Sequence, residues 1–150
     1  MKILAVDYGE ARTGLAICDR TEFLASPLGT LYEKEFAQTV TKIVYTIREY
    51  GVEGVVVGHP VNMDGSRGEK AQICERLADT LRKLTGLPVA LWDERQTTMQ
   101  AATYLNETNV RGQKRKEVID QVAATIILES YLAYRKNEKA TKEKAESEEK

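Results

Sequence analysis

Four acidic residues stand where apolar segments end or begin. Asp7 directly follows an apolar run, and Asp93 and Glu94 follow a second one in "LPVALWDER". Asp120 lies in "VIDQVAATIIL", on one helical line with alanine and isoleucine, so it points toward a sheet rather than into water. Taken singly, each acid has an ordinary structural explanation as a turn residue, a partner of a nearby arginine or a helix cap.

Taken together, the four acids predict a different chemistry. Several carboxylates at one edge of low dielectric constant repel by an amount on the order of several kcal/mol unless a proton or a cation lies between them. Oxygen donors without histidine or cysteine favour Mg²⁺ or Mn²⁺. A carboxylate cluster that holds two such ions is the usual apparatus for hydrolysing a phosphodiester bond, because one ion activates water and the other stabilises the leaving oxygen.

The pattern of apolar residues predicts which elements position these acids. Apolar runs predict strands over 2–8 and 13–18, and Pro27 makes the segment "EFLASPLGTL" an edge strand. Helical periodicity begins near Lys34 and closes at Gly51. The remaining expected elements are strands in "VEGVVVGHP" and "LPVALWDER", a helix that ends at Gly86 with Ser66 as a candidate cap, a helix from Thr97 or Thr98 through Leu105, and a helix from about Val118 to Arg135.

This order of elements predicts an α/β fold with a mixed five-stranded sheet. Strands one to three should be antiparallel, and strands one, four and five parallel, with helices on both faces. The carboxyl ends of strands one, four and five then share one edge, which is where ligands bind in such sheets.

Basic and polar residues near the same edge are candidates for contacting the phosphates of a nucleic acid. The segment "RGQKRKE" precedes Asp120 and is expected to be a loop that binds the phosphate backbone. Arg12 either braces the acids or meets a phosphate, and Arg95 either neutralises Glu94 or meets a phosphate. The full set of nucleic-acid-binding candidates is Arg12, Asn62, Arg67, Arg95, Arg111, Lys114, Arg115 and Lys116.

Length and composition set the limits of the chain. Its 150 residues suit one domain, and its net charge of −1 means that any nucleic-acid surface must be local. We expect a domain over 1–136 and a charged, disordered tail over 137–150. No apolar stretch is long enough to span a bilayer, so we expect a cytoplasmic protein without a membrane partner.

Four motifs in consistent order make the chain similar to the YqgF family of small bacterial proteins, also called RuvX. They are "VDYGEARTGLA", "VVVGHPVNMDGS", "WDERQTT" and "KRKEVIDQVAATIIL", and the resemblance covers residues 1 to about 135. The family usually carries leucine where His59 stands, a departure that leaves the acids untouched.

The resemblance implies a ribonuclease H-like fold and a metal-dependent nuclease. The family is described both as Holliday junction resolvases and as nucleases that mature the 5′ end of pre-16S ribosomal RNA. Its catalytic acids map onto Asp7, the Asp93–Glu94 pair and Asp120. Asp7, Glu94 and Asp120 are then the expected ligands of two Mg²⁺ or Mn²⁺ ions, and strand alternation allows only one residue of the pair to face them.

The expected partners are structured RNA, branched DNA and ribosomal precursor particles, with the chain a monomer or a weak homodimer. Resolving a four-way junction needs two active sites and therefore a symmetric dimer. An RNA-binding module without catalysis is the second alternative. An actin-like or sugar-kinase ATPase is disfavoured, because that machinery closes two such domains around a nucleotide.

Overall fold

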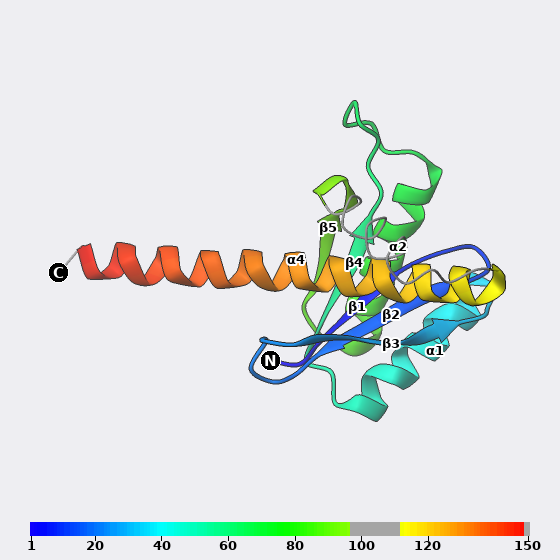
Figure 1. Cartoon of the computed structure of the whole chain (residues 1–150), viewed down its shortest axis with the longest axis horizontal. Coiled ribbons are helices and arrows are strands. Elements are labelled where there is room, and N and C mark those ends of the chain that lie inside the picture. Colours follow the sequence, from blue (N-terminus) through cyan, green and yellow to red (C-terminus); the bar gives the residue numbers. More distant parts are fainter. Residues whose placement is uncertain (97–111, 149–150) are drawn as a thin grey trace.

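The computed structural model describes residues 1–96 and 112–148 and has the expected order of strands (Figure 1). The helix expected from Thr97 or Thr98 through Leu105 lies outside the described residues. The elements are β1 (Ile3–Asp7), β2 (Thr13–Cys18), β3 (Ala25–Leu31), α1 (Phe36–Tyr50), β4 (Gly54–His59), α2 (Glu69–Thr85), β5 (Val89–Asp93), the 3₁₀ turn η1 (Glu94–Gln96) and α4 (Gly112–Glu148).

The five strands form one mixed sheet in the order β3-β2-β1-β4-β5. The pairs β1–β2 and β2–β3 are antiparallel, whereas β1–β4 and β4–β5 are parallel. This confirms the predicted topology, with β3 as an edge strand that tolerates Pro27. The register places Asp7 opposite Gly14 and His59 opposite Asp93, so the carboxyl ends of β1, β4 and β5 meet at one edge.

Helices cover both faces of the sheet, as expected. Because successive side chains of a strand point to opposite faces, Leu4 and Val6 of β1 pack in the cluster that α1 and α2 cover. Ile3 and Ala5 pack in the cluster on the other face, with Ile127 of α4. Asp7 follows this alternation and belongs to the face that α4 covers.

Glycines end both of the first two helices, but the side-chain cap expected at the start of α2 is absent. Gly51 and Gly86 close α1 and α2 in the left-handed conformation, at φ of 65° and 70°. The expectation that Ser66 caps α2 is wrong, because the capping residue is Gly68 and provides no side-chain bond. The Ser66 hydroxyl instead donates to the Asp64 carboxylate at 2.6 Å within the loop.

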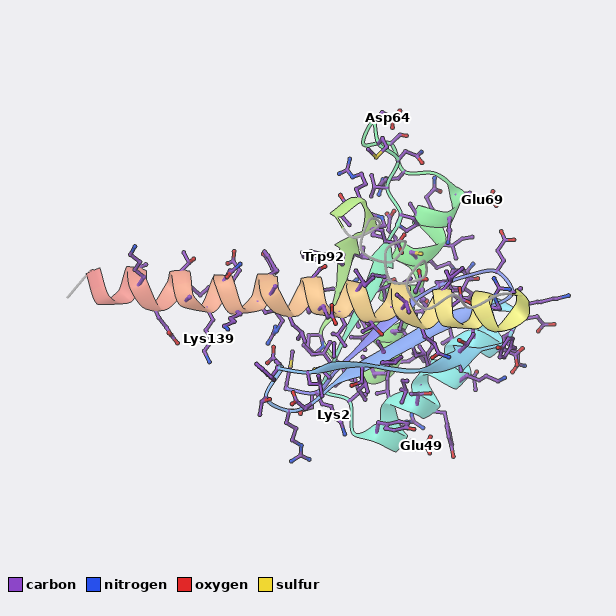
Figure 2. All side chains as sticks on the ribbon, viewed as in Figure 1. Lys2, Glu49, Asp64, Glu69, Trp92 and Lys139 are labelled. Carbon is purple, nitrogen blue, oxygen red and sulfur yellow. The ribbon has the colours of Figure 1, made fainter. Side chains whose placement is uncertain are left out.

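Helix α4 is longer at both ends than its apolar pattern predicts. It begins at Gly112, so Lys114, Arg115 and Lys116 lie in a helix and not in a loop, and Asp120 is too far from the N-terminus to cap it. It continues to Glu148, and Figures 1 and 2 show this part, with Lys139, projecting beyond the sheet. Lysine, glutamate and alanine favour helix even where no face is packed. The helix therefore continues beyond the point where the apolar periodicity ends.

None of the described helices is long and apolar enough to cross a membrane.

Candidate nuclease site at the carboxyl edge of the sheet

Asp7 is a half-buried carboxylate at the end of β1. Burial raises the pKa of Asp7 well above its ordinary value, because desolvation disfavours the charged form. The negative charge of Glu94 and a hydrogen bond between the two carboxyl groups raise it further, and Asp120 adds a smaller effect. Asp7 therefore holds its proton more tightly than a free carboxyl group does when no cation balances the nearby negative charge.

Glu94 reaches Asp7 across the strand that separates them. Glu94 begins η1 after β5, while Asp7 ends β1, and β4 lies between these strands. The crossing is possible because Gly58 of β4 has no side chain: a Cβ there would collide with Oε1 of Glu94 and with the Cδ1 of Ile127. A glycine within a buried strand commonly marks such a close approach. In the sequence alone, Gly58 looks only like a residue that ends an apolar strand.

Asp93 does not face the other acids. Its carboxylate accepts hydrogen bonds from the Arg95 guanidinium, with Nη2 at 2.6 Å and Nε at 2.9 Å from Oδ2. This pairing lowers the pKa of Asp93. Of the two neighbouring acids, Glu94 is thus the one beside Asp7, which agrees with the expectation from strand alternation that only one should be.

Asp120 approaches the edge from α4. Its side chain is 15% exposed and accepts a hydrogen bond from Nε of Arg12 at 2.9 Å. The helix lies so close to β2 that a Cβ at Gly14 would collide with the backbone of Asp120. Gly14 is therefore the residue that lets α4 bring this carboxylate to the strand ends, together with the buried Ala124.

The acids converge without completing a metal site in the described part of the chain. Asp7 and Glu94 form a pair, and Asp120 is near enough to affect the pKa of Asp7 but is held by Arg12. Among the described residues, no group of three histidine, cysteine, aspartate or glutamate side chains is arranged to hold a metal ion.

The predicted phosphate-binding residues are distributed around this edge. Arg95 also donates from Nη1 to the Asn62 carbonyl at 3.4 Å, which ties the turn after β5 to the loop after β4. The Asn62 amide donates to the Ser66 hydroxyl at 2.9 Å, and Arg67 pairs with Glu75 of α2. Arg111 lies outside the described residues.

One cation near the acids was missed from the sequence. The positive charge of Lys70, in the first turn of α2, lowers the pKa of Asp7 and partly offsets the effect of Glu94. In "SRGEKAQ" this lysine looks like an ordinary solvated residue at a helix start, so only the fold reveals that its charge acts on Asp7.

Comparison with known proteins gives the chain its family. The family model described as "RuvX: Holliday junction resolvase" matches residues 1–134. A protein of Lachnospira eligens named "Putative pre-16S rRNA nuclease" is 44% identical over 135 residues, which cover 88% of this chain and 96% of that protein. A protein of the same name from Caldanaerobacter subterraneus is 42% identical over 138 residues, covering 91% of this chain and 99% of that one.

Solved structures support the fold. Thermus thermophilus RuvC in complex with a Holliday junction substrate has a TM-score of 0.56 at 16% identity, covering 90% of this chain and 96% of that chain. The yeast mitochondrial Holliday junction resolvase Ydc2 has a TM-score of 0.55 at 11% identity, covering 87% of this chain and 77% of that chain. The ribonuclease H-like fold is thereby confirmed, and the chain belongs to the RuvX family.

Proposed function

We propose that the chain is a divalent-metal-dependent nuclease that hydrolyses a phosphodiester bond during maturation of the 5′ end of pre-16S ribosomal RNA. The names of relatives that are 44% and 42% identical over nearly their whole length support this substrate. The observation that carries the proposal is that the carboxyl groups of Asp7 and Glu94 meet over Gly58 at the carboxyl edge of the parallel strands.

The donor set at this edge fits Mg²⁺ or Mn²⁺. All the candidate ligands are carboxylate oxygens, and two carboxyl groups in contact at a partly buried edge suit a hard divalent cation that balances their charge. Asp7 and Glu94 would hold the ion or ions, with Asp120 as the third ligand. When bound, the metal supplies the positive charge that polarises a phosphate and activates water.

The chain's own residues would orient the substrate. Arg12 holds the Asp120 carboxylate in place, and its guanidinium would be available there to meet a phosphate. Arg95 fixes the loop that carries Asn62 and Arg67 above the strand ends. Lys114, Arg115 and Lys116, from the first turns of α4, and Arg111 would contact the phosphate backbone. The natural substrate would then be a ribosomal precursor particle in the cytoplasm.

A side-by-side cleavage assay tests this proposal. The full chain, with Mg²⁺ or with Mn²⁺, receives a 16S ribosomal RNA precursor with a 5′ extension and, separately, a four-way DNA junction. Asp7→Asn is the inactive control, and Asp79→Asn on the exposed side of α2 is the matched control for removing one carboxylate. We expect metal-dependent cutting of the RNA that is lost only in Asp7→Asn.

Other results would overturn the proposal in identifiable ways. Symmetric nicking of the junction with the RNA intact would replace it by junction resolution, which the family description names. Binding of the RNA without metal-dependent cutting of either substrate would leave a binding module.

A further inference from the structure

A groove lies far from the acids, between the turn that joins β2 to β3 and the second half of α4. Its volume is about 770 Å³. Antiparallel pairing puts the end of β2, and hence this turn, at the edge of the sheet opposite Asp7. Its lining includes Glu22 and Phe23 of the turn and Tyr134, Lys136, Lys139 and Lys142 of α4.

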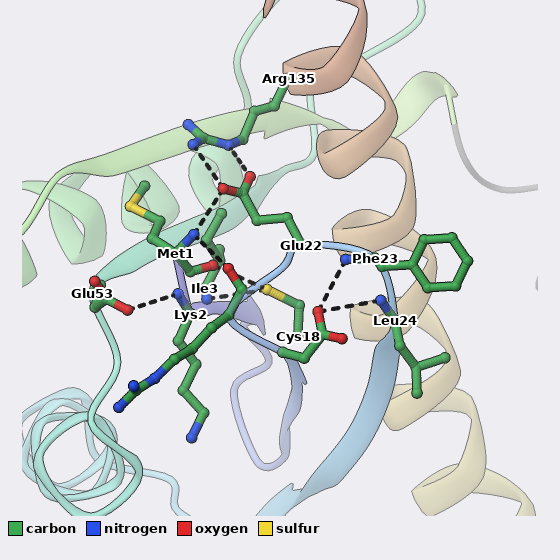
Figure 3. A network of polar contacts seen from close by, with 11 residues as sticks. Met1, Lys2, Ile3, Cys18, Glu22, Phe23, Leu24, Glu53 and Arg135 are labelled. Atoms are coloured by element: carbon green, nitrogen blue, oxygen red, sulfur yellow. Dashed lines mark hydrogen bonds and ion pairs between the residues drawn. The ribbon is translucent and has the colours of Figure 1, made fainter.

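The groove has an excess of positive charge. Lys136, Lys139 and Lys142 recur at intervals of three residues along α4, and all three line it. Of the two acids in the lining, Glu22 is already neutralised: it accepts from Nε of Arg135 at 2.6 Å and from the N-terminal amino group at 2.8 Å (Figure 3). The whole chain has a net charge of −1, so this positive charge is a local feature of the groove. A local excess of positive charge favours binding of a polyanion.

Aromatic rings stand beside the lysines. Phe23 is 87% exposed and Tyr134 is 49% exposed, so both rings are accessible from solvent. Tyr134 stacks on Tyr131 with ring centroids 6.5 Å apart, and Trp92 of β5 packs against both. Exposed rings bordered by cations are the combination on which unpaired bases stack while the phosphates meet lysine.

The turn that presents Phe23 is fixed in an unusual conformation. Glu22 has φ of 60°, in the left-handed region that non-glycine residues rarely adopt. Its two ion pairs hold it there, and the Asp19 carboxylate accepts a hydrogen bond from the Phe23 amide at 3.0 Å. In Figure 3 Glu22 points toward Arg135, while the Phe23 ring points away from that network. The exposure of Phe23 is therefore built into the turn.

A second copy of the chain fits this surface poorly. From Lys136 to Lys144 the helix is exposed and contains no large apolar side chain, so it offers no seam for packing against another helix. A charged face with flat rings at its base fits an extended nucleic-acid strand better than a protein partner.

The geometry points to this groove as a binding site for a single-stranded flank of the RNA substrate, an inference that deepens the proposed nuclease function and rests on it. Asp120 and Arg135 are separated by fifteen positions of α4, about 22 Å at the rise of an α-helix. One helix thus connects the acids at one end of the sheet with the groove at the other. A strand that leaves the cleavage site along α4 would meet Tyr134 and then the lysines.

Binding measured in EDTA separates this site from catalysis. The probe is a fluorescent single-stranded oligoribonucleotide of about ten nucleotides, a length within the range that such surfaces bind. The groove variant replaces Lys136, Lys139 and Lys142 by alanine in the full chain, and the matched variant replaces Lys34, Lys83 and Lys144, three exposed lysines outside the groove. We expect affinity to fall at least about tenfold at low salt in the groove variant, and the logarithmic salt slope to become shallower by about 2.

The contribution of stacking is tested by Phe23→Ala, with Tyr45→Ala as the control because Tyr45 is also exposed but lies on α1. We expect Phe23→Ala to weaken binding of the single strand about tenfold and to leave binding of a duplex unchanged. If the groove variant and the matched lysine variant lost affinity for the oligoribonucleotide equally, or if neither lost affinity, the inference would be overturned. Metal-dependent cleavage by the wild type would then still stand, so the two proposals fail separately.

Discussion

The carboxylate of Glu94 lies against Gly58, and only the missing side chain of that glycine lets Glu94 cross β4 and share a hydrogen bond with Asp7. The pairing of acids from β1 and β5 thus depends on a residue of the strand between them.

Replacing Gly58 by alanine should therefore damage both activity and stability. The added methyl group meets the Glu94 carboxylate and Ile127, so Glu94 must move away from Asp7. We expect a destabilisation of about 1–3 kcal/mol and a loss of cleavage larger than the loss of folded protein explains. Urea unfolding and cleavage rates measure the two effects. Gly29→Ala is the control, because nothing lies within 4 Å of a Cβ there, and it should change neither.

The raised pKa of Asp7 predicts how stability changes with pH in the absence of metal. The folded state holds the proton more tightly than the unfolded chain, in which the value is near 3.8. The stabilising contribution of the protonated Asp7 is fully present below pH 3.8 and is lost as pH rises through the raised pKa of the folded state. Urea unfolding in EDTA should therefore show that Asp7→Asn becomes more stable relative to the wild type as pH rises. A constant difference across that range would contradict the assigned pKa direction.

Divalent cations should restore the stability that the wild type loses as Asp7 deprotonates. If Asp7 and Glu94 hold a metal, adding Mg²⁺ or Mn²⁺ raises the wild-type melting temperature at neutral pH, since a ligand that binds only the folded state stabilises it. Asp7→Asn should show little or none of this increase. An equal increase in both proteins would place the cation elsewhere.

The Arg12–Asp120 pair predicts a modest effect on stability. Arg12→Gln leaves the Asp120 carboxylate, which is 15% exposed, without its charged partner. The Arg12 side chain is 34% exposed, so water already weakens the ion pair. We therefore expect the free energy of unfolding, measured in urea, to fall by only about 1 kcal/mol. The exposed pair of Lys83 and Asp79 provides the comparison. Lys83→Gln should cost less than about 0.5 kcal/mol, and equal effects of the two variants would argue against a structural role for Arg12.

The pKa of Glu22 predicts acid sensitivity at the opposite end of the sheet. Hydrogen bonds from Arg135 and the N-terminus lower it from 4.5 to about 2. Its stabilising contribution is therefore present above pH 4.5 and is lost as pH falls toward 2. Arg135→Gln should flatten this part of the stability–pH curve in urea unfolding, and an unchanged curve would contradict the pairing.

The sequence predicted the sheet and the region of the site because both rest on local signals. Alternating and continuous apolar runs specify strands, and strand order determines which ends meet, so Asp7, Glu94 and Asp120 could be placed at one edge in advance. The choice between Asp93 and Glu94 needed the structure, since it depends on Arg95 folding back on Asp93. The role of Gly58 was also hidden, because a strand-ending glycine and a glycine that admits a neighbour's side chain look alike in a sequence.

The helix boundaries show a different limit. Apolar periodicity predicts where α4 packs on the sheet, from near Val118 to Arg135, but says little about turns that pack on nothing. The composition of the lysine- and glutamate-rich turns after Arg135 predicts a disordered tail, whereas the structure has them in the helix as far as Glu148. The division into a domain over 1–136 and a tail stays a prediction.

The most direct test of the account compares two adjacent acids. Glu94→Gln and Asp93→Asn each remove one carboxylate, but only Glu94 lies beside Asp7. In the cleavage assay on the 5′-extended precursor RNA with Mn²⁺, we predict that Glu94→Gln loses at least about a hundredfold in rate and that Asp93→Asn loses less than about tenfold. Equal losses, or the larger loss in Asp93→Asn, would contradict the assignment of Asp7 and Glu94 as the catalytic pair.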